Sequence, residues 1–378
     1  MSDIAKQKLN NLLYEEEVKK KLLHLEATPK YITLGTHFGC NASCVFCLGG
    51  DYSSFTIERY KDFFEPKLGE ALKTANNVGF CGFGEILAYP RICELLDYLD
   101  KTIPNQSKAF TTNGIVLSNN ELCDKLTNGK YDLMISLHAS NAELHKKLTK
   151  TEKFNEIIEN IKKLVALKRK KNAHLSITLV FVVTTENLED LPAFIDMAGA
   201  LEIDCISANY ITLYEPSQID MSVFWNKQKA NEILEITEQA AKKYPNMRVN
   251  LPLAFKQYEK NTDIIACRDP WEFFYVETQG SVNPCCLAGS HIGYLDKTPF
   301  NEIWNSQGYK CLREGLVTGK THIWCKNCLK FDKNNVNNIL SHITFRPETQ
   351  EKLLKYIFDN NHKYNLSEEF VGVTGFAN

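Results

Sequence analysis

The chain has 378 residues, 44% of them hydrophobic, which suits one large core and a smaller module in one or two domains. A formal net charge of −2 gives no electrostatic basis for binding nucleic acid or anionic lipid, so we expect neither partner. No apolar run approaches the roughly 18 residues of a membrane-spanning helix and no signal-peptide pattern is present, so we expect a cytoplasmic protein without membrane contact.

The predicted elements begin with one helix over residues 1–30. From residue 31 to about 250, β-branched runs alternate with segments of helical period, which predicts an α/β fold with a parallel sheet and right-handed crossovers. The six expected strands are Tyr31–Thr36, Asn77–Cys81, Lys108–Thr111, Tyr131–Leu137, Leu175–Val183 and Cys205–Tyr210. An open doubly wound sheet and a partial barrel both fit this pattern, and in both the ligands bind beyond the C-terminal ends of the strands.

The pattern changes from about residue 260. Strand and helix alternation stops there, and spaced cysteines lie among turn residues, which predicts a small cluster-binding module over residues 260–335. Residues 345–378 are expected to form a closing helix and a tail.

Three of the thirteen cysteines lie just after the first expected strand, at Cys40, Cys44 and Cys47. Cytosolic thiols stay reduced, so clustered cysteines there bind metal more often than they form disulfides. Soft thiolates suit iron–sulfur clusters and zinc, and His37 could complete a zinc site. Three thiolates with no fourth would instead leave one iron of a cluster open, as a catalytic site requires.

Four further cysteines, Cys267, Cys285, Cys325 and Cys328, could complete the coordination of a second cluster or of a zinc ion. No cysteine follows Cys328 in the sequence, and Cys286 is adjacent to a ligand, so it could compete for the metal or act as a nearby thiol donor.

The spacing of Cys40, Cys44 and Cys47, with Phe46 before the last cysteine, resembles the radical S-adenosylmethionine (radical SAM) superfamily. The resemblance implies a partial (β/α)6 TIM-type barrel over residues 31–250. It also implies that the open iron chelates S-adenosylmethionine, whose cleavage yields a 5′-deoxyadenosyl radical that takes a hydrogen atom from the substrate. Residues at the strand ends then correspond to cofactor-binding positions of the family: Phe46, Gly82, Gly84, Glu85, Ser136, His138 and Asn187.

The later cysteines resemble the auxiliary-cluster modules of this superfamily, named SPASM and twitch. The match to twitch implies one auxiliary [4Fe–4S] cluster beside the S-adenosylmethionine-binding [4Fe–4S] cluster. An external one-electron donor such as flavodoxin or ferredoxin is also implied.

The fate of the substrate radical stays open at this stage. Oxidation needs an electron acceptor and a base, epimerisation needs a thiol hydrogen donor, and coupling forms a new bond. We expect dehydrogenation of a small polar substrate such as a sugar or cyclitol, with Cys286, Tyr210 and Arg268 as the candidate catalytic residues. The alternatives are epimerisation or crosslinking of a ribosomal peptide, and a metal-binding protein without catalysis.

Overall fold

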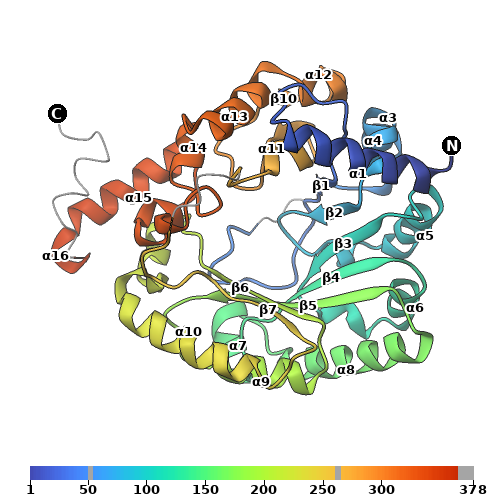
Figure 1. Ribbon diagram of the computed structural model, residues 1–378. Coiled ribbons are helices and arrows are strands. Elements are labelled where there is room, and N and C mark those ends of the chain that lie inside the picture. Colours follow the sequence, from blue (N-terminus) through green and yellow to red (C-terminus); the bar gives the residue numbers. More distant parts are fainter. Residues whose placement is uncertain (50–53, 260–264, 365–378) are drawn as a thin grey trace.

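A ten-stranded sheet runs through the computed structural model, which describes residues 1–49, 54–259 and 265–364. The strand order is β10-β9-β8-β1-β2-β3-β4-β5-β6-β7. The strands are β1 (Tyr31–Gly35), β2 (Asn77–Cys81), β3 (Ser107–Thr112), β4 (Tyr131–Ser136), β5 (Leu175–Val183), β6 (Cys205–Tyr210), β7 (Arg248–Asn250), β8 (Phe273–Val276), β9 (Ser281–Asn283) and β10 (Gly293–Tyr294). The sheet curves around an interior crossed by loops, with helices outside it (Figure 1).

The parallel core confirms the expected α/β partial barrel. Strands β1 to β7 are parallel to their neighbours throughout. Three of the six expected strands, β2, β5 and β6, have the predicted bounds. β1 and β4 each end one residue earlier than expected, and β3 extends one residue further at both ends. The sheet stays open, because β7 forms one edge and β8 continues the sheet beyond β1.

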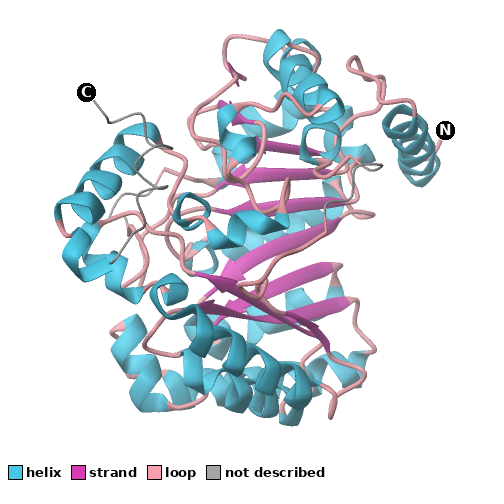
Figure 2. Cartoon of the chain, turned by 60° about the vertical axis from the view of Figure 1, so that its left-hand side comes forward, coloured by secondary structure: helices cyan, strands magenta, loops and turns pink. Residues whose placement is uncertain are grey.

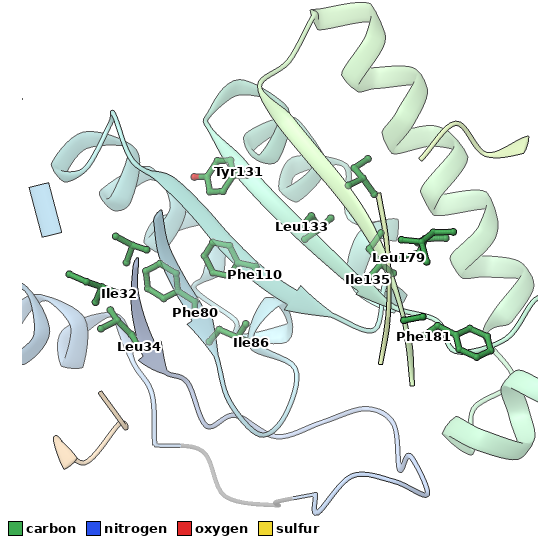
Figure 3. Close-up of a cluster of buried hydrophobic side chains, with 14 of the residues drawn as sticks. Ile32, Leu34, Phe80, Ile86, Phe110, Tyr131, Leu133, Ile135, Leu179 and Phe181 are labelled. Carbon is green, nitrogen blue, oxygen red and sulfur yellow. The ribbon is translucent and has the colours of Figure 1, made fainter. Parts of the chain in front are cut away.

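One face of the barrel sheet is covered by helices and forms the main core. In β4 and β5 the alternate residues toward this face are buried, and those on the other face are half-buried. Phe80 and Phe110 stack with ring centroids 4.8 Å apart, between aliphatic side chains of the neighbouring strands (Figure 3). The covering helices are α5 (Ile92–Thr102), α6 (Asn120–Asn128), α7 (Ala142–Thr149), α8 (Phe154–Lys171), α9 (Leu191–Ala200) and α10 (Lys227–Ala241).

The N-terminal helix is shorter than residues 1–30. Helix α1 covers Asp3–Lys19, and Lys21 then adopts a φ of 55°, which ends the helix. The Glu17 carboxylate accepts a hydrogen bond from the Glu26 N–H at 2.6 Å, so the chain doubles back along α1 before it enters β1. Short helices α2 (Ile57–Arg59), α3 (Glu65–Leu68) and α4 (Glu70–Thr74) connect β1 to β2.

The cysteine-rich region is not separate from the barrel sheet, which corrects the expectation that strands stop near residue 260. Strand β8 pairs in parallel with β1, and β9 and β10 add antiparallel strands beyond it. The boundary expected at residue 260 and the tail after residue 364 lie outside the described residues. The region's helices are α11 (Asp269–Glu272), α12 (Phe300–Trp304), α13 (Gln307–Thr318) and α14 (Ile323–Lys326).

The chain then returns to the barrel, where a segment distant in sequence lies beside the end of β6. Figure 2 shows the sheet from another side, with helices around it. A parallel bridge joins Leu213, just after β6, to Ile343. The expected closing helix follows as α15 (Pro347–Asp359), with α16 (Asn361–Tyr364) after it. In the described ranges, no helix has the length and apolar character needed to cross a membrane.

Candidate active site

The loop after β1 carries the first thiol site, which consists of Cys40, Cys44 and Cys47. The loop is held against α7, where the Val45 N–H donates to the Leu148 carbonyl at 2.9 Å. Burial, followed by the charges of Cys47 and Cys40, raises the pKa of Cys44 to about 12, which places the three thiols within electrostatic range of one another. Three soft ligands without a fourth in the loop fit an iron–sulfur cluster with one open iron.

Gly82 and Gly84 let the segment after β2 lie against this loop. A Cβ atom at Gly82 would lie 2.3 Å from the Thr36 carbonyl oxygen, and one at Gly84 would lie 1.4 Å from the Phe38 carbonyl oxygen. Gly84 also has a φ of 111°, which L side chains rarely adopt. The two glycines therefore allow the backbone after β2 to lie against the backbone after β1. That contact sets the position of the first thiol site.

The buried Glu85 carboxylate joins this segment to the end of β3. One oxygen accepts from the Asn113 N–H at 2.6 Å and the other from the Leu87 N–H at 3.2 Å. Burial raises the pKa of Glu85 to about 7, although these hydrogen bonds act in the opposite direction. The Asn113 side chain donates to Asn41 inside the thiol loop at 2.6 Å, so Glu85 supports the loop through Asn113.

His138, just after β4, lies edge-on to Phe46 of the thiol loop, with ring centroids 4.7 Å apart. Its Nδ1 accepts a hydrogen bond from the Val182 N–H at 3.1 Å. Burial lowers the pKa of His138 to about 3, so the ring is neutral and carries its proton on Nε2. A neutral imidazole donor beside the loop fits contact with an oxygen atom of S-adenosylmethionine.

Asn187 holds the His138 turn and has no hydrogen-bonding group left for a cofactor. Its Nδ2 donates to the carbonyls of His138 and Val182, each at 2.9 Å. Its Oδ1 accepts from the N–H and the hydroxyl of Thr184 at 2.8 and 3.0 Å. The expectation of direct cofactor binding by Asn187 is therefore corrected to a positioning role. Ser136 ends β4, half-buried, and its contact with the cofactor stays a prediction.

The auxiliary thiol site consists of four thiols that line one cavity of about 40 Å³: Cys267, Cys285, Cys325 and Cys328. The other walls are largely apolar and include Trp324 and Phe331. Burial raises the pKa of Cys267 to about 12 and that of Cys325 to about 11, so a bound cluster must displace their protons. Four thiols in an apolar enclosure fit the closed coordination of a [4Fe–4S] cluster.

A single metal ion fits the same residues less well. Over the described ranges, no three His, Cys, Asp or Glu side chains converge as the ligands of one ion do. Thiols spread around a cavity match the wider ligand spacing of a cluster with several irons.

A second cavity, the central cavity, has a volume of about 140 Å³ and adjoins the auxiliary thiol cavity. Its lining includes Phe83, which precedes Gly84, and Cys286 and Leu287, which follow an auxiliary ligand. Leu287 and Phe345 line both this cavity and the auxiliary thiol cavity, so the two are neighbours.

Tyr214 shows that the central cavity is also close to the first thiol site. Burial raises the pKa of Tyr214, Arg346 lowers it, and the charges of Cys286 and Cys47 raise it. The hydroxyl of this cavity-lining residue is therefore within electrostatic reach of the first thiol site and of Cys286, which follows Cys285 in the chain. The Tyr214 N–H donates to Gln218 Oε1 at 2.8 Å, and Gln218 Nε2 donates to the Val45 carbonyl at 3.4 Å in the first thiol loop.

Glu277 lines the central cavity and contacts His37, and the sequence pattern alone did not single out Glu277. Its Oε2 lies 3.1 Å from His37 Nε2, because β8 and β1 are paired and both residues follow the ends of these strands. Asn283 donates to the other Glu277 oxygen at 3.5 Å. The run Phe273–Val276 before a turn was the available signal for a further strand.

Two of the three candidate catalytic residues lie away from the central cavity. The Tyr210 hydroxyl donates to the Leu253 carbonyl at 2.9 Å, and its ring stacks on Phe255, so Tyr210 is part of an aromatic cluster. Burial and Glu272 raise the pKa of Tyr14, and the exposed Arg268 acts in the opposite direction, which places its guanidinium beside α1. The structure corrects both predicted roles, and Cys286 alone of the three lines the cavity.

Comparison with known families agrees with this arrangement. Residues 35–198 match the radical SAM superfamily, and residues 267–329 match the SPASM family, an iron–sulfur cluster-binding domain. The chain carries a radical SAM domain followed by a SPASM-type domain. These domains imply S-adenosylmethionine and two [4Fe–4S] clusters.

Curated relatives include two proteins named probable GTP 3′,8-cyclase. The one from Methanocaldococcus jannaschii is 30% identical over 159 residues, which span 40% of this chain and 49% of that protein. The one from Saccharolobus islandicus (strain Y.N.15.51) is 28% identical over 227 residues, 58% of this chain and 70% of that protein. The match to the first relative thus spans about half of that protein's length.

Solved structures show the same fold at low sequence identity. Streptococcus suis SuiB is 16% identical with a TM-score of 0.61, over 80% of this chain and 71% of SuiB. A tagged anSMEcpe with bound AdoMet is 17% identical with a TM-score of 0.58, over 88% of this chain and 97% of that protein.

Proposed function

We propose that this radical SAM enzyme dehydrogenates a small polar substrate, such as a sugar or cyclitol, in the central cavity. The observation that carries the proposal is that a carboxylate, Glu277, and the wall beside the auxiliary ligand Cys285 belong to one cavity. Oxidation of a carbon radical needs a base and an electron acceptor close together, and the cavity offers a place for both. The volume of about 140 Å³ is below the roughly 300 Å³ of pockets for drug-sized ligands, which supports a small substrate or a single side chain.

When bound, S-adenosylmethionine supplies the radical that removes a hydrogen atom, and the auxiliary cluster supplies an acceptor for one electron. Glu277 takes the proton of the substrate hydroxyl, and His37 holds the carboxylate in place at 3.1 Å. The substrate thus loses one hydrogen atom, one proton and one electron, and its alcohol carbon becomes a carbonyl. An external reductant such as flavodoxin or ferredoxin would supply the electron that starts each turnover.

A nucleoside triphosphate, the substrate suggested by the names of the curated relatives, fits the lining less well. A triphosphate carries several negative charges, so its recognition calls for several cationic groups. Among the residues that line the central cavity, Arg346 alone carries a fixed positive charge, and Glu277 adds a negative one. This balance of charge favours a substrate with at most one anionic group.

The test is Glu277→Gln, with the exposed Glu302→Gln on α12 as the matched control. Anaerobically loaded protein is given S-adenosylmethionine, a reductant and a panel of deuterated sugars and cyclitols. We expect deuterium in 5′-deoxyadenosine and a product two hydrogens lighter. Glu277→Gln should still transfer deuterium but should lower the rate of the oxidised product by about 10²- to 10⁴-fold. Equal product formation by both variants would exclude Glu277 as the base.

Cys286 supports epimerisation as a second candidate function. Its thiol is exposed toward the central cavity and follows an auxiliary ligand. In this reaction the S–H bond gives a hydrogen atom to the substrate radical, and the resulting sulfur radical is returned to the thiol by one electron from the external donor and one proton. Cys286→Ala is compared with Cys311→Ala, an exposed thiol on α13 outside the cavity lining. Epimerisation is supported if the unsubstituted protein forms a product with the mass of the substrate and only Cys286→Ala loses turnover. A product lighter than the substrate from both variants would exclude epimerisation.

A further inference from the structure

Arg346 stands apart from the other arginines of the described chain. It is an exposed residue that lines the central cavity at the N-cap of α15, and its guanidinium forms no hydrogen bond or ion pair with any described residue. The others have partners: Arg91 pairs with Glu58 and Glu94, Arg169 with Glu202, Arg59 binds the Thr278 carbonyl, Arg248 contacts Cys205, Arg313 binds main-chain carbonyls, and Arg268 acts on Tyr14.

The position of Arg346 is fixed by the segment that closes the cavity. The Thr344 N–H donates to the Leu213 carbonyl at 3.1 Å, and the Leu213 N–H donates to the His342 carbonyl at 2.8 Å. These bonds tie the chain before α15 to the end of β6. Burial raises the pKa of Tyr214 and the Arg346 guanidinium acts in the opposite direction, which places that guanidinium near Tyr214.

In the described part of the chain, the one carboxylate that lines the cavity, Glu277, contacts His37 and not Arg346. Glu277 is bound by His37 at 3.1 Å, and no ion pair joins Glu277 to Arg346 within the described residues. A guanidinium presents a planar set of donors that matches the paired oxygen atoms of a carboxylate or phosphate. The cavity thus offers a base at one place and an unpaired oxyanion-binding group at another.

We propose that Arg346 binds an oxyanion of the substrate, a carboxylate or a phosphate monoester, while the carbon to be oxidised faces Glu277. This inference rests on the proposed function of the same cavity and narrows its substrate class to small polar molecules with one anionic group. Arg346 would then determine specificity and orientation, and it would not take part in hydrogen abstraction.

The first experiment measures anion binding without any turnover. The loaded protein is treated with phenylglyoxal in the presence of inorganic phosphate, acetate or neither, and modification of each arginine is followed by peptide mass spectrometry. We expect phosphate or acetate to slow modification of Arg346 several-fold and saturably, with Arg91 unaffected. Protection by phosphate alone indicates a phosphate ester, and protection by acetate indicates a carboxylate. Equal modification of Arg346 with and without both anions would overturn the inference.

The second experiment separates this inference from the proposed function. A deuterated metabolite extract is fractionated on an anion exchanger, and each fraction is tested for deuterium transfer to 5′-deoxyadenosine. Transfer from a retained fraction supports the inference, and transfer only from the unretained neutral fraction overturns it while leaving the dehydrogenase proposal intact. Absence of transfer from every fraction counts against the proposed function. Whether Arg346 binds an anion is then decided by the phenylglyoxal experiment without reference to turnover.

Substitution provides the third readout. With the retained fraction, Arg346→Gln should raise the half-saturating substrate concentration by about ten- to a hundredfold with little change in maximal rate. Arg346→Lys should recover part of that loss, and Arg91→Gln should match the unsubstituted protein. A fall in maximal rate without a change in half-saturation would contradict a binding role.

Discussion

The contact between the glycine segment and the first thiol loop predicts a graded series of substitutions. Gly84→Ala places a Cβ atom 1.4 Å from the Phe38 carbonyl oxygen at a φ of 111°. Overpacking costs about 1–3 kcal/mol, and a left-handed conformation for alanine costs about 1–2 kcal/mol. Gly84→Ala should therefore destabilise the contact between the glycine segment and the thiol loop by about 2–5 kcal/mol. Gly82→Ala has the clash at 2.3 Å without a positive φ, and Gly319→Ala has a φ of 76° with no atom within 4 Å.

The assay is iron content and S-adenosylmethionine cleavage after anaerobic reconstitution. We expect Gly84→Ala to retain the iron of the auxiliary site, lose about half of the total, and cleave no S-adenosylmethionine. Gly82→Ala should be intermediate, and Gly319→Ala should match the unsubstituted protein. Full iron content and full cleavage in Gly84→Ala would refute the argument that backbone contact positions the loop.

Three other predictions follow from the sites and the core. Cys44→Ala should abolish S-adenosylmethionine cleavage, measured as 5′-deoxyadenosine, whereas Cys325→Ala should retain some cleavage and stop product formation. Burial lowers the pKa of His342 from 6.5 to about 4, so the folded state resists protonation of a group that the unfolded chain protonates below about 6.5. Its contribution is therefore present at pH 7 and falls by about 2 kcal/mol by pH 5, which chemical unfolding at the two pH values should show and His342→Gln should remove. Gln218→Ala should reduce cleavage by loosening Val45, and Gln228→Ala on α10 is its control.

The sequence predicted the parts of this molecule that depend on local periodicity. Strand β5 and helix α8 have strong apolar patterns, and the spacing of Cys40, Cys44 and Cys47 is itself a chemical signal. What escaped prediction depends on contacts between distant segments. Glu277 becomes part of the cavity only because β8 pairs with β1, and Arg346 only because Ile343 bridges to Leu213.

The failed residue roles have the same physical origin. Tyr210 ends β6 and Arg268 follows Cys267 of the auxiliary thiol site, so both positions in the sequence are typical of a functional site. Neither side chain lines the central cavity, because the Tyr210 ring stacks on Phe255 and the Arg268 guanidinium lies beside Tyr14. No spacing rule encodes either neighbour, since both lie more than forty residues away.

The pairing of β8 with β1 also determines how the two thiol sites are related. Neighbouring parallel strands lie about 4.8 Å apart and end at the same edge, so His37 and Glu277 meet directly beyond them. Gly35 permits this approach, because a Cβ atom there would lie 2.9 Å from the Glu277 Cα atom. The first thiol loop and the segment leading to Cys285 thus extend from adjacent strands of one sheet. Main-chain hydrogen bonds between β1 and β8, rather than the packing of two separate domains, hold Glu277 at a constant position beside His37.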